Sequence, residues 1–224
     1  MNKFTTPAGV IPIIYEDADI IAISKPHGLH CIDDRHKEQM HTLRSILDDR
    51  YGKIYIVHRL DAGTGGLMLC AKTPAAHAFL CDQFERNAIK KEYLAITEGN
   101  FGAAVSLMLP ISSKIAHGKY KLNFKSGKRA ITSFLPISCG REASLVSVQP
   151  FTGRTHQIRV HLKAHKHPLV ADWVYNKPDN DRRLPLFALS LEFTHPRTGN
   201  MKLIAPISAY MQNIAAQYRL KLPQ

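Results

Sequence analysis

Apolar residues along this chain occur in short runs that alternate with turn residues, and only a few stretches have helical spacing. The β-type pattern predicts strands at residues 13–15, 20–23, 53–57, 66–71 and 93–97. From residue 101 to residue 149, further short strands are expected to alternate with turns. The strands therefore carry most of the predicted structure.

Helical spacing is limited to short segments. Thr73-Pro74 is a strong helix start, because a hydroxyl N-cap precedes a proline at the first helical position, and Asn87 is the expected end. The other helices are predicted at residues 42–49, 155–165 and 208–218. Because strands outnumber helices without regular alternation, the pattern predicts an α+β fold.

Length and composition indicate one compact unit. The 224 residues contain 45% hydrophobic and 21% charged residues, which are ordinary globular values and exclude disorder along most of the chain. No internal repeat, low-complexity tract or long linker interrupts the sequence. We therefore expect a single domain over residues 1–224.

The charge is the unusual feature of the composition. Thirty Lys and Arg against eighteen Asp and Glu give a net charge of +12, which points to a polyanionic partner. Between Gly99 and Ala171 the only acidic residue is Glu142, against eleven Lys or Arg. No run approaches the ~18 apolar residues of a membrane span, and the scattered cysteines fit a reducing cytoplasm. These features favour a nucleic acid over a membrane.

The loop at residues 58–66 is the first candidate for chemistry. It contains three glycines in four residues, and Asp61 is its only carboxylate, beside His58 and Arg59. A nucleophilic carboxylate needs a fixed position and cationic neighbours that keep it ionised. Taken alone, however, Asp61 could equally be a turn residue that hydrogen-bonds its own backbone.

A second polar cluster opens the helix predicted at 155–165. His156, Arg159 and Lys163 have helical spacing, so we expect them to share one cationic face after the Gly153 turn. Such a face suits phosphate or carboxylate binding. A generic exposed basic helix would give the same pattern.

Together, the two motifs resemble the RluA-type pseudouridine synthases. His58-Arg59-Leu60-Asp61-Ala62-Gly63-Thr64-Gly65-Gly66 is similar to the H-R-L-D-x-x-T-S-G signature of that family, and residues 153–161 match its G-R-T-H-Q-I-R-V-H block. The order of the motifs is also that of the family. Further matches are Lys25-Pro26-x-Gly28, Lys90-Lys91-x-Tyr93, His167-Pro168-Leu169-Val170-x-Asp172 with Tyr175, and Thr194-His195-Pro196.

The resemblance implies the pseudouridine synthase fold, a mixed and mostly antiparallel sheet with flanking helices. It also implies isomerisation of uridine in ribosomal or transfer RNA, by detaching the base and rejoining it through C5. The catalytic residues implied are Asp61 as nucleophile, Tyr93 as candidate general base and Arg159 as the partner of Asp61. Arg59 would fill the space left by the flipped nucleotide, which otherwise costs a few kcal/mol. The predicted RNA-binding residues are Arg59, His58, Arg154 and His156.

Two positions depart from the family pattern. Gly65 replaces the usual Ser, and Ala171 replaces the Gly that precedes Asp172, which puts the rigidity of the loops in question. No S4-like RNA-binding module is expected before the catalytic domain. We also expect a monomer that needs no metal, cofactor or protein partner.

Two alternatives compete with this interpretation. A catalytically inactive RNA-binding protein of the same fold would predict damage at Asp61, Tyr93 or Arg159, and all three are present. A metal hydrolase would have to use a group of histidines, of which only His161 and His165 have i, i+4 ligand spacing. No acidic residue between those two completes a site.

Overall fold

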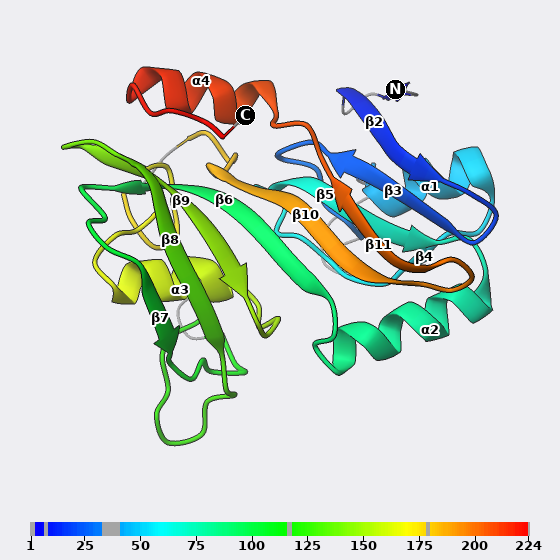
Figure 1. The fold of residues 1–224 in the computed structure, drawn as a ribbon, viewed down its shortest axis with the longest axis horizontal. Coiled ribbons are helices and arrows are strands. Elements are labelled where there is room, and N and C mark those ends of the chain that lie inside the picture. Colours follow the sequence, from blue (N-terminus) through cyan, green and yellow to red (C-terminus); the bar gives the residue numbers. More distant parts are fainter. Residues whose placement is uncertain (1–2, 7–8, 33–40, 116–117, 178–179, 224) are drawn as a thin grey trace. The chain divides into compact units, whose positions relative to one another are not determined.

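The computed structural model describes the chain except for residues 1–2, 7–8, 33–40, 116–117, 178–179 and 224 (Figure 1). The chain divides into two compact units. The first unit comprises residues 1–89 and 188–206, and the second comprises residues 90–187 and 207–224. A single domain over residues 1–224 stays a prediction.

The first unit is a sheet with two helices. Its elements are β1 (Lys3–Thr6), β2 (Gly9–Glu16), β3 (Ile20–Lys25), α1 (Leu43–Tyr51), β4 (Tyr55–Ile56), β5 (Gly65–Ala71), α2 (Pro74–Glu85), residues 188–195 of β10 (Leu186–His195), and β11 (Gly199–Ile204). The strand order is β1-β2-β3-β5-β10, with β4 beside β5 and β11 beside β10. The pairs β1–β2, β2–β3, β3–β5, β4–β5 and β10–β11 are antiparallel.

The core of this unit is centred on β3 and β5. Every residue of both strands is buried, which explains why they are nearly continuous apolar runs rather than alternating ones. Helix α1 begins at a capping box in which Thr42 and Ser45 satisfy each other's backbone N–H groups. Helix α2 begins as the sequence predicts, since Thr73 accepts the N–H of Ala76 and Pro74 occupies the first turn.

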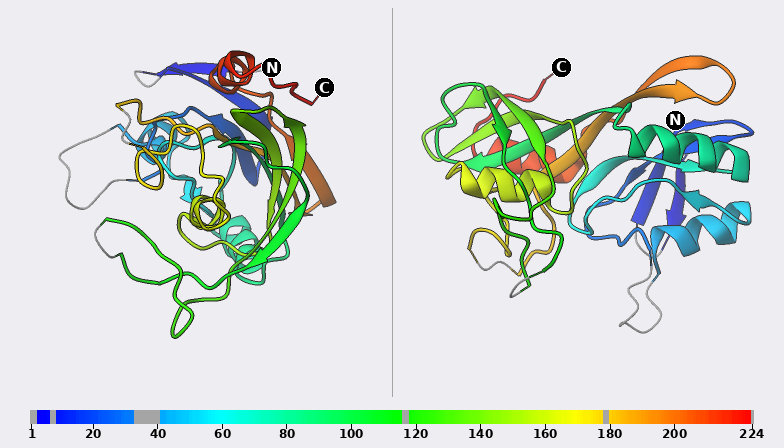
Figure 2. Two further views of the ribbon diagram at one scale, coloured as in Figure 1. Left: turned by 90° about the vertical axis from the view of Figure 1, so that its left-hand side faces the viewer. Right: turned by 90° about the horizontal axis from the view of Figure 1, so that it is seen from below.

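The second unit is a four-stranded antiparallel sheet that packs on a helix. Its elements are β6 (Lys90–Glu98), β7 (Val105–Met108), β8 (Ile131–Cys139), β9 (Ala143–Pro150), α3 (Gln157–Ala164) and α4 (Ala209–Gln217). The strand order is β6-β9-β8-β7. Figure 2 shows α3 inside the curve of these strands. Ile158 and Leu162 of α3 join the buried cluster that includes Phe134 of β8 and Val148 of β9.

The observed elements confirm the α+β class and the mostly antiparallel sheet. Several boundaries differ from the predictions, and the sequence pattern does not predict β1, β10 or β11. The strand predicted at 53–57 is only Tyr55–Ile56, the two residues that pair with β5. The region expected to hold only short strands contains β8 and β9, of nine and eight residues. The helix predicted to start at residue 155 starts at Gln157, because His156 has a left-handed backbone with φ +55°.

His161 ties α3 to the sheet of the second unit. Its ring is fully buried, with Nδ1 2.9 Å from the Thr132 hydroxyl and Nε2 2.9 Å from the carbonyl oxygen of Leu109. A carbonyl only accepts, so Nε2 carries the proton and the neutral ring satisfies both contacts. Burial lowers the pKa of His161 below its usual value of 6.5.

We expect this histidine to make the protein less stable in mild acid. The unfolded state binds a proton on His161 as the pH falls through 6.5, while the folded state resists it, so the stabilisation present above that pH is lost below it. His161→Gln should remove this pH dependence and cost about 1–3 kcal/mol at pH 7.5. Urea unfolding of both proteins at pH 7.5 and 5.5 measures the difference. Parallel pH curves for the two proteins would contradict the assignment.

Candidate active site

Asp61 lies in the tight turn that leads from β4 into β5. The N–H of Thr64 donates to the carbonyl oxygen of Asp61 at 3.0 Å and closes the turn. Leu60 is buried and anchors the loop, whereas Asp61 is half-buried and Arg59 is exposed. The loop therefore holds one half-buried aspartate and one exposed arginine on a fixed backbone.

Thr64 is the other polar residue of this turn. Its side-chain hydroxyl is buried, with 2% of the residue exposed, and has no hydrogen-bond partner among the described residues. The next residues enter β5 through Gly66, whose φ of +109° favours glycine. A Cβ on Gly66 would lie 2.2 Å from the carbonyl oxygen of Ala188, so this backbone crosses β10 too closely for any side chain.

A buried lysine holds the same turn from the other side. Lys25, at the end of β3, is 1% exposed. Its ammonium donates hydrogen bonds to the carbonyl oxygens of Pro26 (3.0 Å), Leu29 (2.8 Å) and Ala62 (3.1 Å). The Ala62 oxygen also accepts the N–H of Gly28 at 2.8 Å. All three ammonium protons are used, and one of them fixes the residue that follows Asp61.

The electrostatics of this lysine involve Asp61 directly. Burial lowers the pKa of Lys25 to about 8, while the electrostatic influence of the nearby Asp61 acts to raise it. At pH 7 the ammonium form still predominates, because the pH is below that value. The Lys25 ammonium therefore places a positive charge next to the loop that carries Asp61.

His58 is held by the core of the first unit. Its Nε2 accepts the N–H of Leu69 at 3.0 Å, and its ring stacks on Phe84 with centroids 4.6 Å apart. These contacts orient the ring from β5 and α2. An RNA contact through His58 stays a prediction, as does one through the exposed Arg59.

Arg159 is a buried cation of the second unit. It is 3% exposed and forms two parallel hydrogen bonds with Asp172, from Nε to Oδ2 and from Nη2 to Oδ1, both 2.8 Å long. Its guanidinium lies over the rings of Trp173 at 5.4 Å and Tyr175 at 5.0 Å. This bidentate geometry fixes the plane of the guanidinium.

Asp172 is in turn held by its own backbone neighbours. Its Oδ1 accepts the N–H groups of Val174 at 3.0 Å and Tyr175 at 3.1 Å. The predicted partner of Arg159, Asp61, belongs to the first unit, so that pairing stays a prediction. Tyr93 is on β6 of the second unit, where it pairs with Val148 of β9 and packs at the edge of the core.

The expected cationic face of α3 is wrong. His156 precedes the helix in a left-handed conformation, Arg159 is buried and paired with Asp172, and of the three only Lys163 is exposed, so they do not form an exposed cationic helix face. The Nδ1 of His156 lies 3.0 Å from the hydroxyl oxygen of Tyr175. Arg154 is exposed and donates from Nε to the carbonyl oxygen of Arg129 at 3.1 Å.

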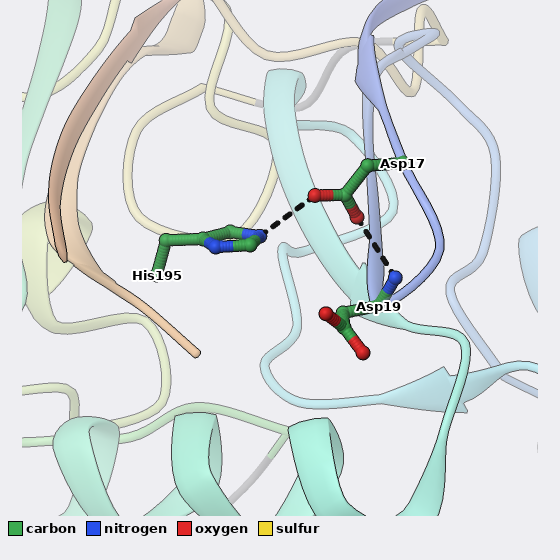
Figure 3. Close-up of side chains that lie close together, drawn as sticks. All are labelled: Asp17, Asp19 and His195. Atoms are coloured by element: carbon green, nitrogen blue, oxygen red, sulfur yellow. Dashed lines mark hydrogen bonds and ion pairs between the residues drawn. The ribbon is translucent and has the colours of Figure 1, made fainter. Parts of the chain in front are cut away.

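A cluster of possible metal ligands lies in the first unit (Figure 3). Asp17, Asp19 and His195 have ligand atoms within 4.8 Å of one another. The Oδ1 of Asp17 accepts two backbone N–H groups, and its Oδ2 accepts the Tyr15 hydroxyl at 3.1 Å and lies 2.9 Å from His195 Nε2. Asp19 pairs with Arg197.

The protonation of this cluster argues against a metal. The Nδ1 of His195 accepts the N–H groups of Arg197 and Thr198, both at 3.2 Å, so the ring proton is on Nε2 and faces Asp17. A metal would need that nitrogen unprotonated and would compete with the Arg197 cation. These ion pairs and hydrogen bonds link the β2–β3 hairpin to the β10–β11 hairpin, and the residues do not fit a metal centre.

Histidines that a metal hydrolase would use already have hydrogen-bond partners within the protein. Both ring nitrogens of His161 contact Thr132 and Leu109, and Nδ1 of His167 lies 2.8 Å from the carbonyl oxygen of Glu98. A metal would have to displace these partners. The i, i+4 pair of His161 and His165 therefore does not fit a ligand set.

Sequence reasoning missed the roles of two residues. In the sequence Lys25 stands out only as part of the Lys25-Pro26-x-Gly28 motif, although a lysine at the end of an apolar run of strand residues is a signal of a buried charge. Asp172 likewise stands out only as part of a motif, and nothing in the spacing links it to Arg159. That link requires the turn at 172–175 to fold back on α3.

Comparison with known proteins identifies the family. Residues 19–164 match the model of the RNA pseudouridylate synthase family. The dual-specificity RNA pseudouridine synthase RluA of Vibrio vulnificus is 34% identical over 214 residues, covering 88% of this chain and 84% of that protein. The ribosomal large subunit pseudouridine synthase D of Borreliella burgdorferi is 31% identical over 210 residues, covering 87% of this chain and 64% of that protein.

Solved structures agree on the fold. The human RNA pseudouridylate synthase domain containing 1 has a TM-score of 0.81 at 24% identity, covering 96% of this chain and 90% of that one. Within the described part of the chain, no helix is long and apolar enough to cross a membrane. The matched family model covers more than half of the chain, and the sequence identity extends beyond it. The chain therefore belongs to the RNA pseudouridylate synthase family.

Proposed function

We propose that this protein is an RNA pseudouridine synthase that isomerises uridine in ribosomal or transfer RNA, with Asp61 as the nucleophile. The observation that carries the proposal is the Asp61 turn. Asp61 is half-buried, its backbone is fixed by the hydrogen bonds of Thr64 and Ala62, and the buried Lys25 ammonium binds the same turn. We propose that the protein acts in the cytoplasm as a monomer without a metal or cofactor.

The reaction is an isomerisation, so it requires no oxidant or co-substrate. The bond between C1′ and N1 of the uridine breaks, the uracil ring turns, and a bond between C1′ and C5 forms. The proton on C5 is lost and N1 gains one, which leaves the atom count unchanged. Asp61 would attack the nucleotide as the nucleophile, and Tyr93 would accept the C5 proton as the general base. Arg159 would stabilise the Asp61 carboxylate.

A uridine inside a helix must leave its stack before Asp61 can reach it. Arg59, exposed two residues before Asp61, is suited to occupy the vacated space, because a planar guanidinium stacks on bases and donates several hydrogen bonds. The segment between β7 and β8 supports RNA binding. Its exposed cations are Lys114, Lys119, Lys121, Lys125, Lys128 and Arg129.

Asp61→Asn should abolish pseudouridine formation while RNA affinity stays within about threefold, because phosphate contacts supply most of the affinity. Pseudouridine mapping of cellular RNA from cells with and without the protein identifies the substrate, and that RNA then serves for turnover and binding assays. Turnover retained by Asp61→Asn would contradict the nucleophile.

Arg159→Ala should destabilise the protein by about 3–5 kcal/mol, since it leaves the Asp172 carboxylate buried without its partner. Asp172→Asn is the matched control, because it breaks the same pair but keeps the guanidinium available for Asp61. Urea unfolding gives the stability of each variant, and turnover is then compared per folded molecule. We expect Arg159→Ala to be the slower enzyme. Equal turnover of the two variants would assign Arg159 to Asp172 alone.

Arg59→Ala should slow the reaction on a structured stem-loop more than on a flexible single strand. The difference should be on the order of 10–100-fold in rate, which corresponds to the few kcal/mol that unstacking costs. Arg86→Ala, which removes an exposed arginine of the first unit paired with Asp82, controls for the loss of one positive charge. Equal rate losses on both RNAs at matched salt would contradict a wedge role for Arg59.

A further inference from the structure

The backbone conformation of Gly65 does not require a glycine, but its surroundings leave no room for a side chain. Its φ lies outside the left-handed region, unlike that of Gly66. A Cβ at residue 65 would lie 2.4 Å from Nε2, 2.5 Å from Cδ2 and 2.9 Å from Cε1 of the His27 ring. The imidazole of His27 therefore occupies the space in which a side chain at residue 65 would begin.

The same imidazole is bonded to the Asp61 turn. Its Nδ1 lies 3.0 Å from the carbonyl oxygen of Gly63, and because a carbonyl only accepts, Nδ1 carries the proton. The neighbouring carbonyl, that of Ala62, accepts from the backbone of Gly28 and from Lys25. Residues 25–28 thus hold two consecutive carbonyl groups directly after Asp61.

We propose that His27 is a positioning residue for Asp61 and that His27 and Gly65 act as one unit. The ring fixes the turn by its hydrogen bond to Gly63 and by filling the volume over Gly65. This inference rests on the proposed role of Asp61. It also accounts for the departure of Gly65 from the T-S-G pattern: the rigidity that a serine would be expected to supply here comes from the ring of a residue 38 positions earlier in the chain.

Accurate placement matters because the reaction depends on the distance from the carboxylate to C1′. A displacement of about 1 Å in a reacting group can cost on the order of 10²-fold in rate. Removing the ring frees the Gly63 carbonyl, whereas adding a side chain at residue 65 expels the ring. Either change should lower kcat more than it weakens RNA binding, since neither alters the exposed cations of the protein.

A double-mutant cycle tests the pair. His27→Ala and Gly65→Ser should each lower kcat by about 10–100-fold, with KM and the Kd for RNA within about threefold of the wild type. In the double variant, Gly65→Ser should add less than about threefold to the loss from His27→Ala, because the clash has been removed. If the loss of kcat in the double variant equals the product of the two single losses, the two residues act independently and the coupling is overturned.

A second comparison does not depend on tolerance of the serine. His27→Asn keeps an N–H donor near the position of Nδ1, so its kcat should stay within about fivefold of the wild type, well above that of His27→Ala. Equal kcat for the Asn and Ala variants, or an unchanged kcat for His27→Ala, would overturn the positioning role. His77→Ala, on α2, controls for the loss of a histidine, and thermal unfolding is recorded for every variant.

Asp61→Asn, measured in parallel, separates this inference from the proposed function. If it keeps turnover, the nucleophile assignment is wrong and the positioning of Asp61 by His27 is overturned with it. If it is inactive while the His27–Gly65 cycle shows independent losses, only the inference about the pair is overturned.

Discussion

The candidate site depends on the fixation of two carbonyl groups, those of Ala62 and Gly63, by residues 25–28. Lys25 provides the central contact, because its ammonium is buried and its three protons all reach backbone carbonyl oxygens. A buried cation with these partners is costly to disrupt, since any movement of the turn would leave a charged proton without an acceptor. The turn that carries Asp61 is therefore anchored to residues 25–28 although it is a loop.

The second unit uses an ion pair for the same purpose. Arg159 and Asp172 are both buried, and each is held by groups besides its partner, two aromatic rings for the arginine and two backbone N–H groups for the aspartate. Such a pair contributes little net stability compared with apolar packing, but its two parallel hydrogen bonds fix the plane of the guanidinium. The sequence pattern suggested a helix face open to solvent, whereas folding buries the arginine and leaves only Lys163 exposed.

At residue 65, a contact with the distant His27 takes the place of the serine side chain expected within the motif. The expected serine at residue 65 would lie within the motif itself. Here the volume is filled by His27, and Gly65 accommodates the ring only because it has no Cβ. His27 and Gly65, which look unrelated in the sequence, are thus packed against each other in the structure.

Much of this protein followed from its sequence. The cap at Thr73, the apolar runs of β3 and β5, and the α+β class depend on local chemistry and periodicity, which a linear sequence carries in full. The mostly antiparallel sheet was implied by the family resemblance. The ordered motifs were specific enough to identify the family. The sequence could not reveal that Lys25 binds the Ala62 carbonyl, that Arg159 binds Asp172, or that His27 excludes a side chain at residue 65. Each of these contacts joins residues 13 to 38 positions apart, and their proximity is decided by how the turns fold back on the sheet and on α3 rather than by any spacing along the chain.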